Sequence, residues 1–158
     1  MNNELLQKAA AYCSVAERCV SDVREKLTLW LAKDSEDNHL NTADIESIID
    51  YLLKEKYIDE TRYCRAFVND KLRFAKWGRQ KINYMLQVKH VDKAAIREAI
   101  DAIDEEIYLD VLEDVLRTKK KSLRSVESEQ VNIRLYRFAA SRGFETSEIS
   151  KVLKRIKE

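Results

Sequence analysis

An apolar pattern that occurs three times along the chain sets the strongest limit on its fold. Apolar positions in the middle of the chain recur 53 residues later, from Ile82 and Leu135 to Ile100 and Leu153. The pattern also occurs earlier in the chain. There the offset falls from 55 residues at Leu27 to 51 at Ile49, which fits four extra residues at 34–37. Repeats of this length indicate small supersecondary units that bury their apolar faces against their neighbours.

The composition indicates that each unit is helical. The chain of 158 residues has no proline and only two glycines, whereas strand-rich folds of this length need more turn residues. Apolar residues recur at helical spacing, as in the stripe Ile45, Ile48, Ile49 and Leu52. We therefore predict an all-α protein in which three tandem three-helix repeats form an elongated, curved solenoid. The expected repeats are 1–57, 58–104 and 105–158.

Polar residues before several helical stripes predict where the helices begin and end. Ser, Thr, Asp and Asn are favoured N-caps because their side chains accept a hydrogen bond from the first turn. Glycine is favoured just after a helix, where the backbone turns left-handed. The expected N-caps are Ser21, Asn41 or Thr42, Asp59 and Asp92, and the expected helix-ending glycine is Gly143.

The helix expected from about Asp59 to Ala75 has one apolar and one cationic face. At ~100° per residue, a narrow arc holds Arg62, Arg65, Asn69, Arg73 and Lys76. A broader arc on the other side holds Cys64, Phe67, Val68, Leu72 and Ala75. Lys71 projects near the middle of this apolar arc, so it must reach solvent along its methylene stem or bind something there.

Gly78 breaks the chain before the next helix, which begins with Arg79, Gln80 and Lys81. Free N–H groups at a helix start, beside two cations, predict a phosphate or carboxylate site. The candidate polyanion-binding residues are Arg62, Arg65, Lys71, Arg73, Lys76, Arg79 and Lys81. The alternative is a cationic face that is only solvated, as charge runs usually are.

A second, weaker candidate is the cationic run at the end of the long helix that follows residue 105. Cations at a helix C-terminus are favoured by the helix dipole in any case. This secondary basic patch consists of Arg117, Lys119, Lys120, Lys121 and Arg124.

The net charge of +1 conceals an uneven distribution. Residues 59–90 carry eight cations and three anions, whereas residues 34–58 carry seven anions and two cations. Residues 91–116 carry nine anions and two cations. A basic middle between acidic neighbours is compatible with a polyanionic partner but argues against a protein that coats DNA uniformly.

The sequence offers no catalytic or metal-binding constellation. Cys13, Cys19 and Cys64 form no CxxC pair, and His39 and His90 are far apart, so no zinc site is expected. No nucleotide-binding glycine motif and no placed nucleophile is present. No signal peptide or membrane span is recognisable. We expect a cytoplasmic, monomeric protein that is not an enzyme and binds no cofactor.

Residues 57–86 carry a family resemblance. The opening Tyr57-Ile58-Asp59-Glu60-Thr61-Arg62-Tyr63-Cys64 and the helix Gly78-x-x-x-Ile82-x-x-x-Leu86 resemble the second repeat of the bacterial RecX family, and Arg142-Gly143-Phe144 resembles its ending. The family commonly has Asp and Ala at the positions of Glu60 and Cys64, Glu before Leu86, and Lys-Gly-Ile where this chain has Lys89-His90-Val91.

This resemblance implies a modulator, mainly an inhibitor, of the RecA recombinase. Proteins of this kind bind the RecA filament on single-stranded DNA, lie in its groove, and suppress its ATPase, strand exchange and coprotease activities. DNA repair, recombination and the SOS response would be regulated in this way. Weak binding of free DNA stays open. The alternatives are a direct nucleic-acid-binding helical protein and a helical-repeat scaffold for an unrelated protein partner.

Overall fold

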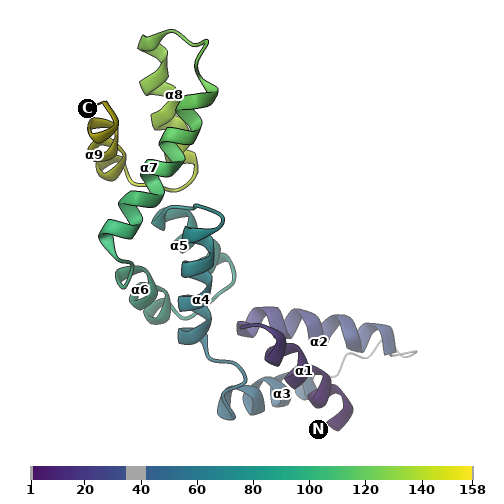
Figure 1. Ribbon diagram of the computed structural model, residues 1–158. Coiled ribbons are helices and arrows are strands. Elements are labelled where there is room, and N and C mark those ends of the chain that lie inside the picture. The colour runs from purple at the N-terminus through teal and green to yellow at the C-terminus, as the bar shows by residue number, and fades with distance from the viewer. Residues whose placement is uncertain (1, 35–41, 158) are drawn as a thin grey trace.

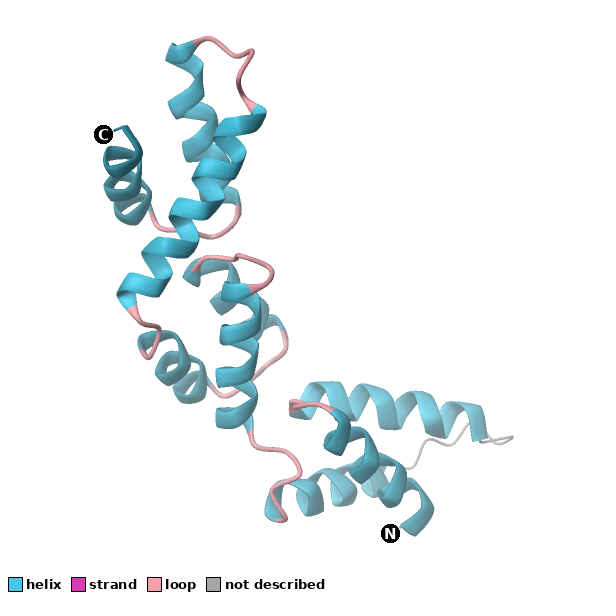
Figure 2. Cartoon of the chain, in the orientation of Figure 1, coloured by secondary structure: helices cyan, strands magenta, loops and turns pink. Residues whose placement is uncertain are grey.

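The computed structural model describes residues 2–34 and 42–157, and within them all regular secondary structure is helical (Figure 2). The expected cap Asn41, the histidine His39 and loop residues 35–37 lie outside these ranges. None of the described helices is long and apolar enough to cross a membrane. The described helices are α1 (Asn3–Val15), α2 (Val20–Asp34), α3 (Thr42–Lys54), α4 (Glu60–Arg73), α5 (Arg79–Val88), α6 (Lys93–Asp101), α7 (Glu105–Ser122), α8 (Ser128–Ser141) and α9 (Thr146–Lys157).

The helices pack in three consecutive triples. α1–α3 contact one another, as do α4–α6 and α7–α9, and we call these triples the first, second and third repeats. Figure 1 shows them following one another along a bent rod, with the two chain ends in the outer repeats. The predicted fold is therefore confirmed: an all-α chain of three tandem three-helix repeats in an elongated, curved solenoid. The repeat boundaries suggested by the sequence stay a proposal.

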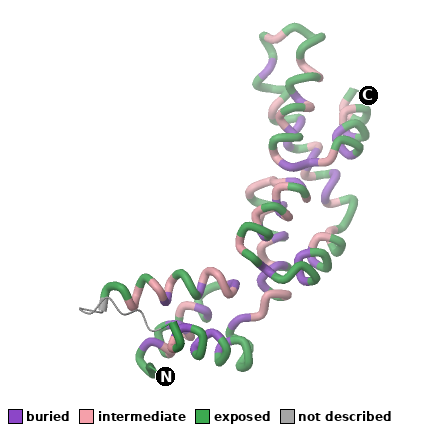
Figure 3. Tube along the Cα trace, turned by 180° about the vertical axis from the view of Figure 1, so that it is seen from behind, coloured by how far each residue is buried: buried purple, intermediate pink, exposed green. Residues whose placement is uncertain are grey.

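The buried side chains form two clusters rather than three. One belongs to the first repeat and contains Leu27, Ile48 and Leu52. The other runs without a break through the second and third repeats and includes Ile82 and Leu112. Figure 3 shows buried positions on the sides of the helices that face one another. The second and third repeats therefore form one continuous body, to which the first repeat is attached.

Two glycines lie at the contact between the second and third repeats. A Cβ atom on Gly78 would be 2.4 Å from the carbonyl group of Gly143, so only glycine allows this approach. Gly143 has a φ of +96° and ends α8 as predicted. Its N–H donates to Ala140 at 3.0 Å and that of Phe144 to Ala139 at 3.2 Å. This is the Schellman arrangement of a helix end.

The contact between the first and second repeats is mainly polar. The carboxylate of Glu60 on α4 accepts hydrogen bonds from the N–H of Val20, at 3.1 Å, and of Asp92, at 3.3 Å. Lys89 Nζ lies 2.9 Å from Asp22 Oδ1. The buried Cys19 adds an apolar contact, because it belongs to the core of the second and third repeats.

The predicted caps are correct at two of the described positions and wrong at one. Asp59 caps α4 by accepting from Arg62 N at 3.1 Å, and Asp92 caps α6 by accepting from Ala95 N at 3.1 Å. Ser21 is not a cap, because α2 already begins at Val20. The N–H of Val20 is bound by Glu60, a partner forty positions away that local spacing does not indicate.

Candidate functional site

The predicted cationic face of α4 exists. Arg62, Arg65, Asn69 and Arg73 are all exposed, whereas Tyr63, Cys64, Val68 and Leu72 of the same helix are buried. Asp59 fixes the start of the helix and so fixes the direction of the whole arc. The side chains of Arg65, Asn69 and Arg73 border a shallow groove against α6 and the start of α7.

Two cations of this face have carboxylate partners on other helices. Arg65 binds Glu98 of α6 at 2.6 Å, and Lys76 binds Asp114 of α7. Both members of the Arg65 pair are more than half exposed. Because exposed pairs contribute only ~0–1 kcal/mol, these cations can exchange their partner for another anion at little cost.

Arg73 differs from the other cations of the face. Its Nε donates to Asn69 Oδ1 at 2.7 Å, and among the described residues no carboxylate lies within ion-pair distance of it. Arg62, at the other end of the helix, binds Glu17 at 2.5 Å and also donates to the carbonyl of Lys56 at 3.1 Å. Arg62 thus connects the first repeat to the second, and Arg73 is the most available cation of the arc.

Lys71 and Lys81 lie in a different environment, around Trp77. Their Nζ atoms are 4.8 and 4.6 Å from the indole centroid, and Lys71 Nζ is also 5.4 Å from the ring of Phe67. Trp77 is half-buried and packs against the core of the second and third repeats. Cations over aromatic rings contribute about 0.5–1 kcal/mol at such sites. The two lysines therefore form part of the packing around Trp77.

At the start of α5, where the sequence predicts an anion site, three backbone N–H groups already have partners within the chain. Gly78 N donates to the carbonyl of Arg142 at 2.8 Å, and Gln80 N to that of Gly143 at 3.0 Å. Arg79 N donates to the hydroxyl of Tyr108 at 3.0 Å. The turn after α8 and a side chain of α7 thus supply acceptors for N–H groups that local sequence rules leave without a partner. These carbonyls come from residues more than sixty positions later.

The side chain of Arg79 is also used within the fold. Its guanidinium binds Glu105 at 2.7 Å and Glu145 at 2.8 Å, and lies 3.8 Å from the centroid of the Tyr108 ring. Burial alone would lower the pKa of Arg79, but the hydrogen bonds to both carboxylates raise it. The hydrogen bond from Arg79 lowers the pKa of Glu105. Arg79 therefore holds the second and third repeats together.

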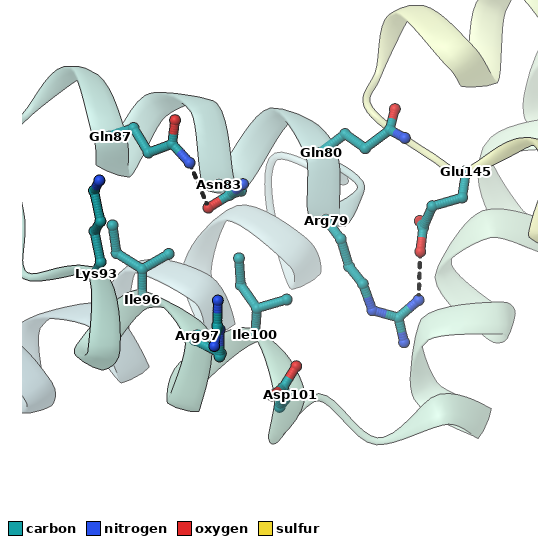
Figure 4. A pocket seen from close by; sticks show the side chains of 10 residues that line it. All are labelled: Arg79, Gln80, Asn83, Gln87, Lys93, Ile96, Arg97, Ile100, Asp101 and Glu145. Carbon is teal, nitrogen blue, oxygen red and sulfur yellow. Dashed lines mark hydrogen bonds and ion pairs between the residues drawn. The ribbon is translucent and has the colours of Figure 1, made fainter.

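A groove of about 350 Å³ runs between α5 and α6 and reaches the Arg79–Glu145 pair (Figure 4). Asn83 and Gln87 of α5 lie along it, and Gln87 Nε2 donates to Asn83 Oδ1 at 3.3 Å. Lys93 and Arg97 of α6 also line it. Amides and cations of this kind can bind polar groups, but they include no nucleophile paired with a base.

The secondary basic patch lies where α7 ends. Lys119 Nζ is 4.8 Å from the ring of Phe138, and Arg117 Nε is 3.7 Å from Glu113. Lys120, Lys121 and Arg124 are exposed and line a pocket together with Arg117.

The cysteines do not form a reactive site. Cys13, Cys19 and Cys64 are free and buried. Burial raises the pKa of the Cys64 thiol to about 12, so at neutral pH it is protonated and a poor nucleophile. In the part of the chain that the structure describes, no group of His, Cys, Asp and Glu could hold a metal ion.

Sequence reasoning missed the residues that join the first and second repeats. Burial alone would raise the pKa of Asp22, but the hydrogen bonds from Lys89 and from the N–H of Cys19 lower it. Glu60 bridges two helix starts in the same region. The only signal in the sequence is that Glu60 stands where the similar family has the shorter Asp.

Comparison with known protein families gives two matches along the chain. Residues 59–100 match the description "RecX, second three-helix domain", and residues 105–153 match "RecX, third three-helix domain". Together the two ranges cover more than half of the chain. They coincide closely with the second and third repeats.

Individual relatives give the same result. A protein from Clostridium beijerinckii named "Regulatory protein RecX" is 31% identical over 85% of this chain and 60% of its own length. One of the same name from Clostridium botulinum is 34% identical over 84% and 58%. The chain thus spans little more than half the length of these relatives. A protein of that name from Yersinia enterocolitica is 25% identical and is covered over 96% of its length.

Two solved structures share the fold. A crystal structure of RecX from Lactobacillus salivarius has a TM-score of 0.79 at 17% identity and covers 98% of this chain and 96% of its own. A crystal structure of regulatory protein RecX has the same TM-score at 18% identity and covers 95% and 72%. At these identities the likeness concerns the fold alone.

Proposed function

Because this chain belongs to the RecX family, we propose that it modulates, and mainly inhibits, the RecA recombinase. It acts by binding rather than by catalysis. It binds the RecA filament on single-stranded DNA, lies in the filament groove, and suppresses ATPase, strand exchange and coprotease activity. In this way it limits recombination, DNA repair and the SOS response. The proposal places it in the cytoplasm as a monomer.

The observation that carries the proposal is the position of the α4 cations on a curved rod. The arc formed by Arg65, Arg73 and Lys76 lies on the middle repeat (Figure 1), so it can engage a partner while the outer repeats reach along it. The segments on either side are acidic. Alternating charge along a binding surface fixes register and suppresses wrong partners more than it raises affinity.

The candidate residues take different parts in this proposal. Arg65, Arg73 and Lys76 face the polyanion, which is either DNA phosphate or an acidic surface of RecA. Arg62 keeps the first repeat in place, and Lys71 and Lys81 support Trp77. Arg79 supports the contact between the second and third repeats. The residues proposed to bind the polyanion are therefore fewer than the eight cations of residues 59–90.

The test is the single-stranded-DNA-dependent ATPase of the cognate RecA, titrated with this protein at physiological salt. Binding to the same DNA is measured in parallel without RecA. We expect inhibition well below one molecule per RecA protomer, at protein concentrations where naked DNA is hardly bound. No inhibition at a stoichiometric excess of folded protein would reject the proposal.

Salt dependence separates the alternatives. A direct nucleic-acid-binding protein relies on phosphate contacts and loses affinity for naked DNA steeply as salt rises. A filament regulator keeps binding to RecA–DNA at a salt concentration that releases naked DNA. A scaffold for an unrelated protein shows neither behaviour.

A double variant tests the site. Replacing Arg65 and Arg73 by Ala should weaken inhibition about tenfold, since each charge contact contributes roughly 0.5–1 kcal/mol. Helicity should not change, because both side chains are exposed. The matched control replaces Arg134 and Arg137, two exposed cations of α8, and should inhibit normally. Equal inhibition by both double variants would remove the α4 face from the proposal.

A further inference from the structure

A pocket of about 660 Å³ lies at the far end of the third repeat, where α7 ends and α8 begins. This volume is within the range of ~300–1,000 Å³ that is typical of ligand pockets. Its apolar lining comes from Leu123 and Val126 of the connecting loop and from Val131 of α8. Leu123 is buried, and the two valines are half-buried. The pocket therefore combines an aliphatic floor with the cations of the secondary basic patch.

Most of the cations around this floor have no carboxylate partner among the described residues. Lys120, Lys121 and Arg124 have no carboxylate within ion-pair distance in residues 2–34 and 42–157. Arg117 has one at 3.7 Å, on its own helix. The single acidic side chain in the lining, Asp114, is already bound to Lys76. The pocket thus offers several free positive charges to an incoming anion.

The aliphatic floor of the pocket favours a protein segment over a nucleic acid as the anionic partner. Sequence-tolerant binding of single-stranded nucleic acid relies on aromatic side chains on which bases stack. No aromatic side chain lines this pocket; its apolar surface is aliphatic. A protein segment that carries Asp or Glu next to a Leu, Ile or Val side chain matches both features. Its carboxylates would meet the four cations, and its apolar side chain would cover the floor.

We propose that the pocket between α7 and α8 is a docking site for an acidic protein segment with an aliphatic anchor residue. Lys120, Lys121 and Arg124 bind its carboxylates, and Leu123, Val126 and Val131 receive the anchor. The site uses a different set of residues from the α4 face. It does not depend on the partner being RecA, so the two proposals can fail independently.

The experiment measures fluorescence anisotropy of a labelled twelve-residue peptide of Asp and Glu that contains two leucines, added to the full chain at ~0.15 M salt. Two further probes are the same peptide with both leucines replaced by serine and a twelve-nucleotide oligothymidylate. We expect the leucine peptide to bind at least fivefold more tightly than the serine peptide. Absence of binding up to millimolar protein would overturn the proposal, as would equal affinity for both peptides.

Variants locate the binding. Lys120→Glu combined with Lys121→Glu should weaken peptide binding at least tenfold, and Val131→Ser should weaken it about fivefold for the leucine peptide only. The matched control, Lys154→Glu with Lys157→Glu on α9, makes the same change in charge and should bind within twofold of the unmodified chain. Circular dichroism checks that each variant is folded.

Two outcomes would contradict the assignment. Equal weakening by the α9 control would show that the peptide responds to overall charge and not to this pocket. Tighter binding of the oligothymidylate than of the leucine peptide, lost with the Lys120 and Lys121 changes, would make the pocket a nucleic-acid site.

Discussion

Gly78 and Gly143 are the only glycines of the chain, and they meet at one point. Gly78 needs to be small because the backbone of Gly143 lies against it. Gly143 needs both its small size and its left-handed conformation, because a Cβ there would be 2.5 Å from Lys81 and its φ is +96°. A Cβ atom added at either position would therefore disturb the contact between the second and third repeats.

We predict that Gly78→Ala lowers the free energy of unfolding by about 1–3 kcal/mol, the usual cost of forcing an extra group into a packed contact. Because the obstacle is backbone, the neighbours cannot rotate away. Urea denaturation measures the effect. Ser125→Ala, in an exposed loop, is the control and should stay within about 0.5 kcal/mol of the unmodified chain. An unchanged urea midpoint for Gly78→Ala would show that the second and third repeats can separate slightly without loss of stability.

His90 provides a second test at this scale. It is exposed and has a φ of +57°, a conformation that costs a non-glycine residue about 1–2 kcal/mol. His90→Gly should raise the free energy of unfolding by about 0.5–1 kcal/mol, after the extra flexibility of glycine is subtracted. Gln87→Gly, inside the neighbouring helix, should instead lower it by about 1 kcal/mol. If both variants lost stability in the same denaturation experiment, the conformation of His90 would not be strained.

At the scale of helices, long-range contacts decide what each cation does. The start, amphipathic faces and exposed arc of α4 follow from local rules, and all were predictable. The partners of its cations were not, because Glu17, Glu98 and Asp114 come from three separate segments. The partners of Arg79 were not predictable for the same reason: Glu105 and Glu145 are 26 and 66 positions away. Spacing in a sequence cannot report such contacts.

The joint between α2 and α5 leads to a prediction about pH. The pKa of Asp22 is lowered in the folded chain, so its contribution to stability is complete above its unfolded pKa of about 3.9 and is lost as pH falls through the folded value. Asp22→Asn should cost roughly 1–2 kcal/mol at pH 5–7 because it removes a charged hydrogen-bond partner of Lys89. The difference from the unmodified chain should shrink below about pH 4.

Urea denaturation at pH 7, 5 and 3.5 checks this prediction. Asp50→Asn, an exposed change on α3, is the matched control and should differ little from the unmodified chain at any of these pH values. A difference for Asp22→Asn that stayed constant down to pH 3.5 would argue against the ion pair.

At the scale of the whole molecule, the contact between the first and second repeats differs from the contact between the second and third. The repeat pattern predicted three units that lean on their neighbours, and the fold agrees. It did not predict that the second and third units share one core while the first has its own. That difference depends on Cys19, Glu60 and the two glycines, whose neighbours in space are distant in sequence.

We predict that the first repeat opens independently of the other two. Amide hydrogen exchange, followed by mass spectrometry, should give α1–α3 a lower opening free energy than α4–α9, because a mainly polar joint transmits little cooperativity. Gly78→Ala should speed exchange in α5 and α8 but leave α1–α3 unaffected. A single opening free energy for all helices would contradict this division.

The hydrogen bonds from Gly78 and Gln80 to the carbonyls of Arg142 and Gly143 also concern the order in which the chain is made. Synthesis proceeds from the N-terminus, and folding units form as they leave the ribosome. The first repeat can complete its own core once Ile58, the last buried residue of that core, has emerged. The second repeat lacks the backbone partners of Gly78 and Gln80 until the residues that follow α8 have been made. A chain whose synthesis stops before residue 142 would therefore have a complete first repeat and a second repeat without these two backbone partners.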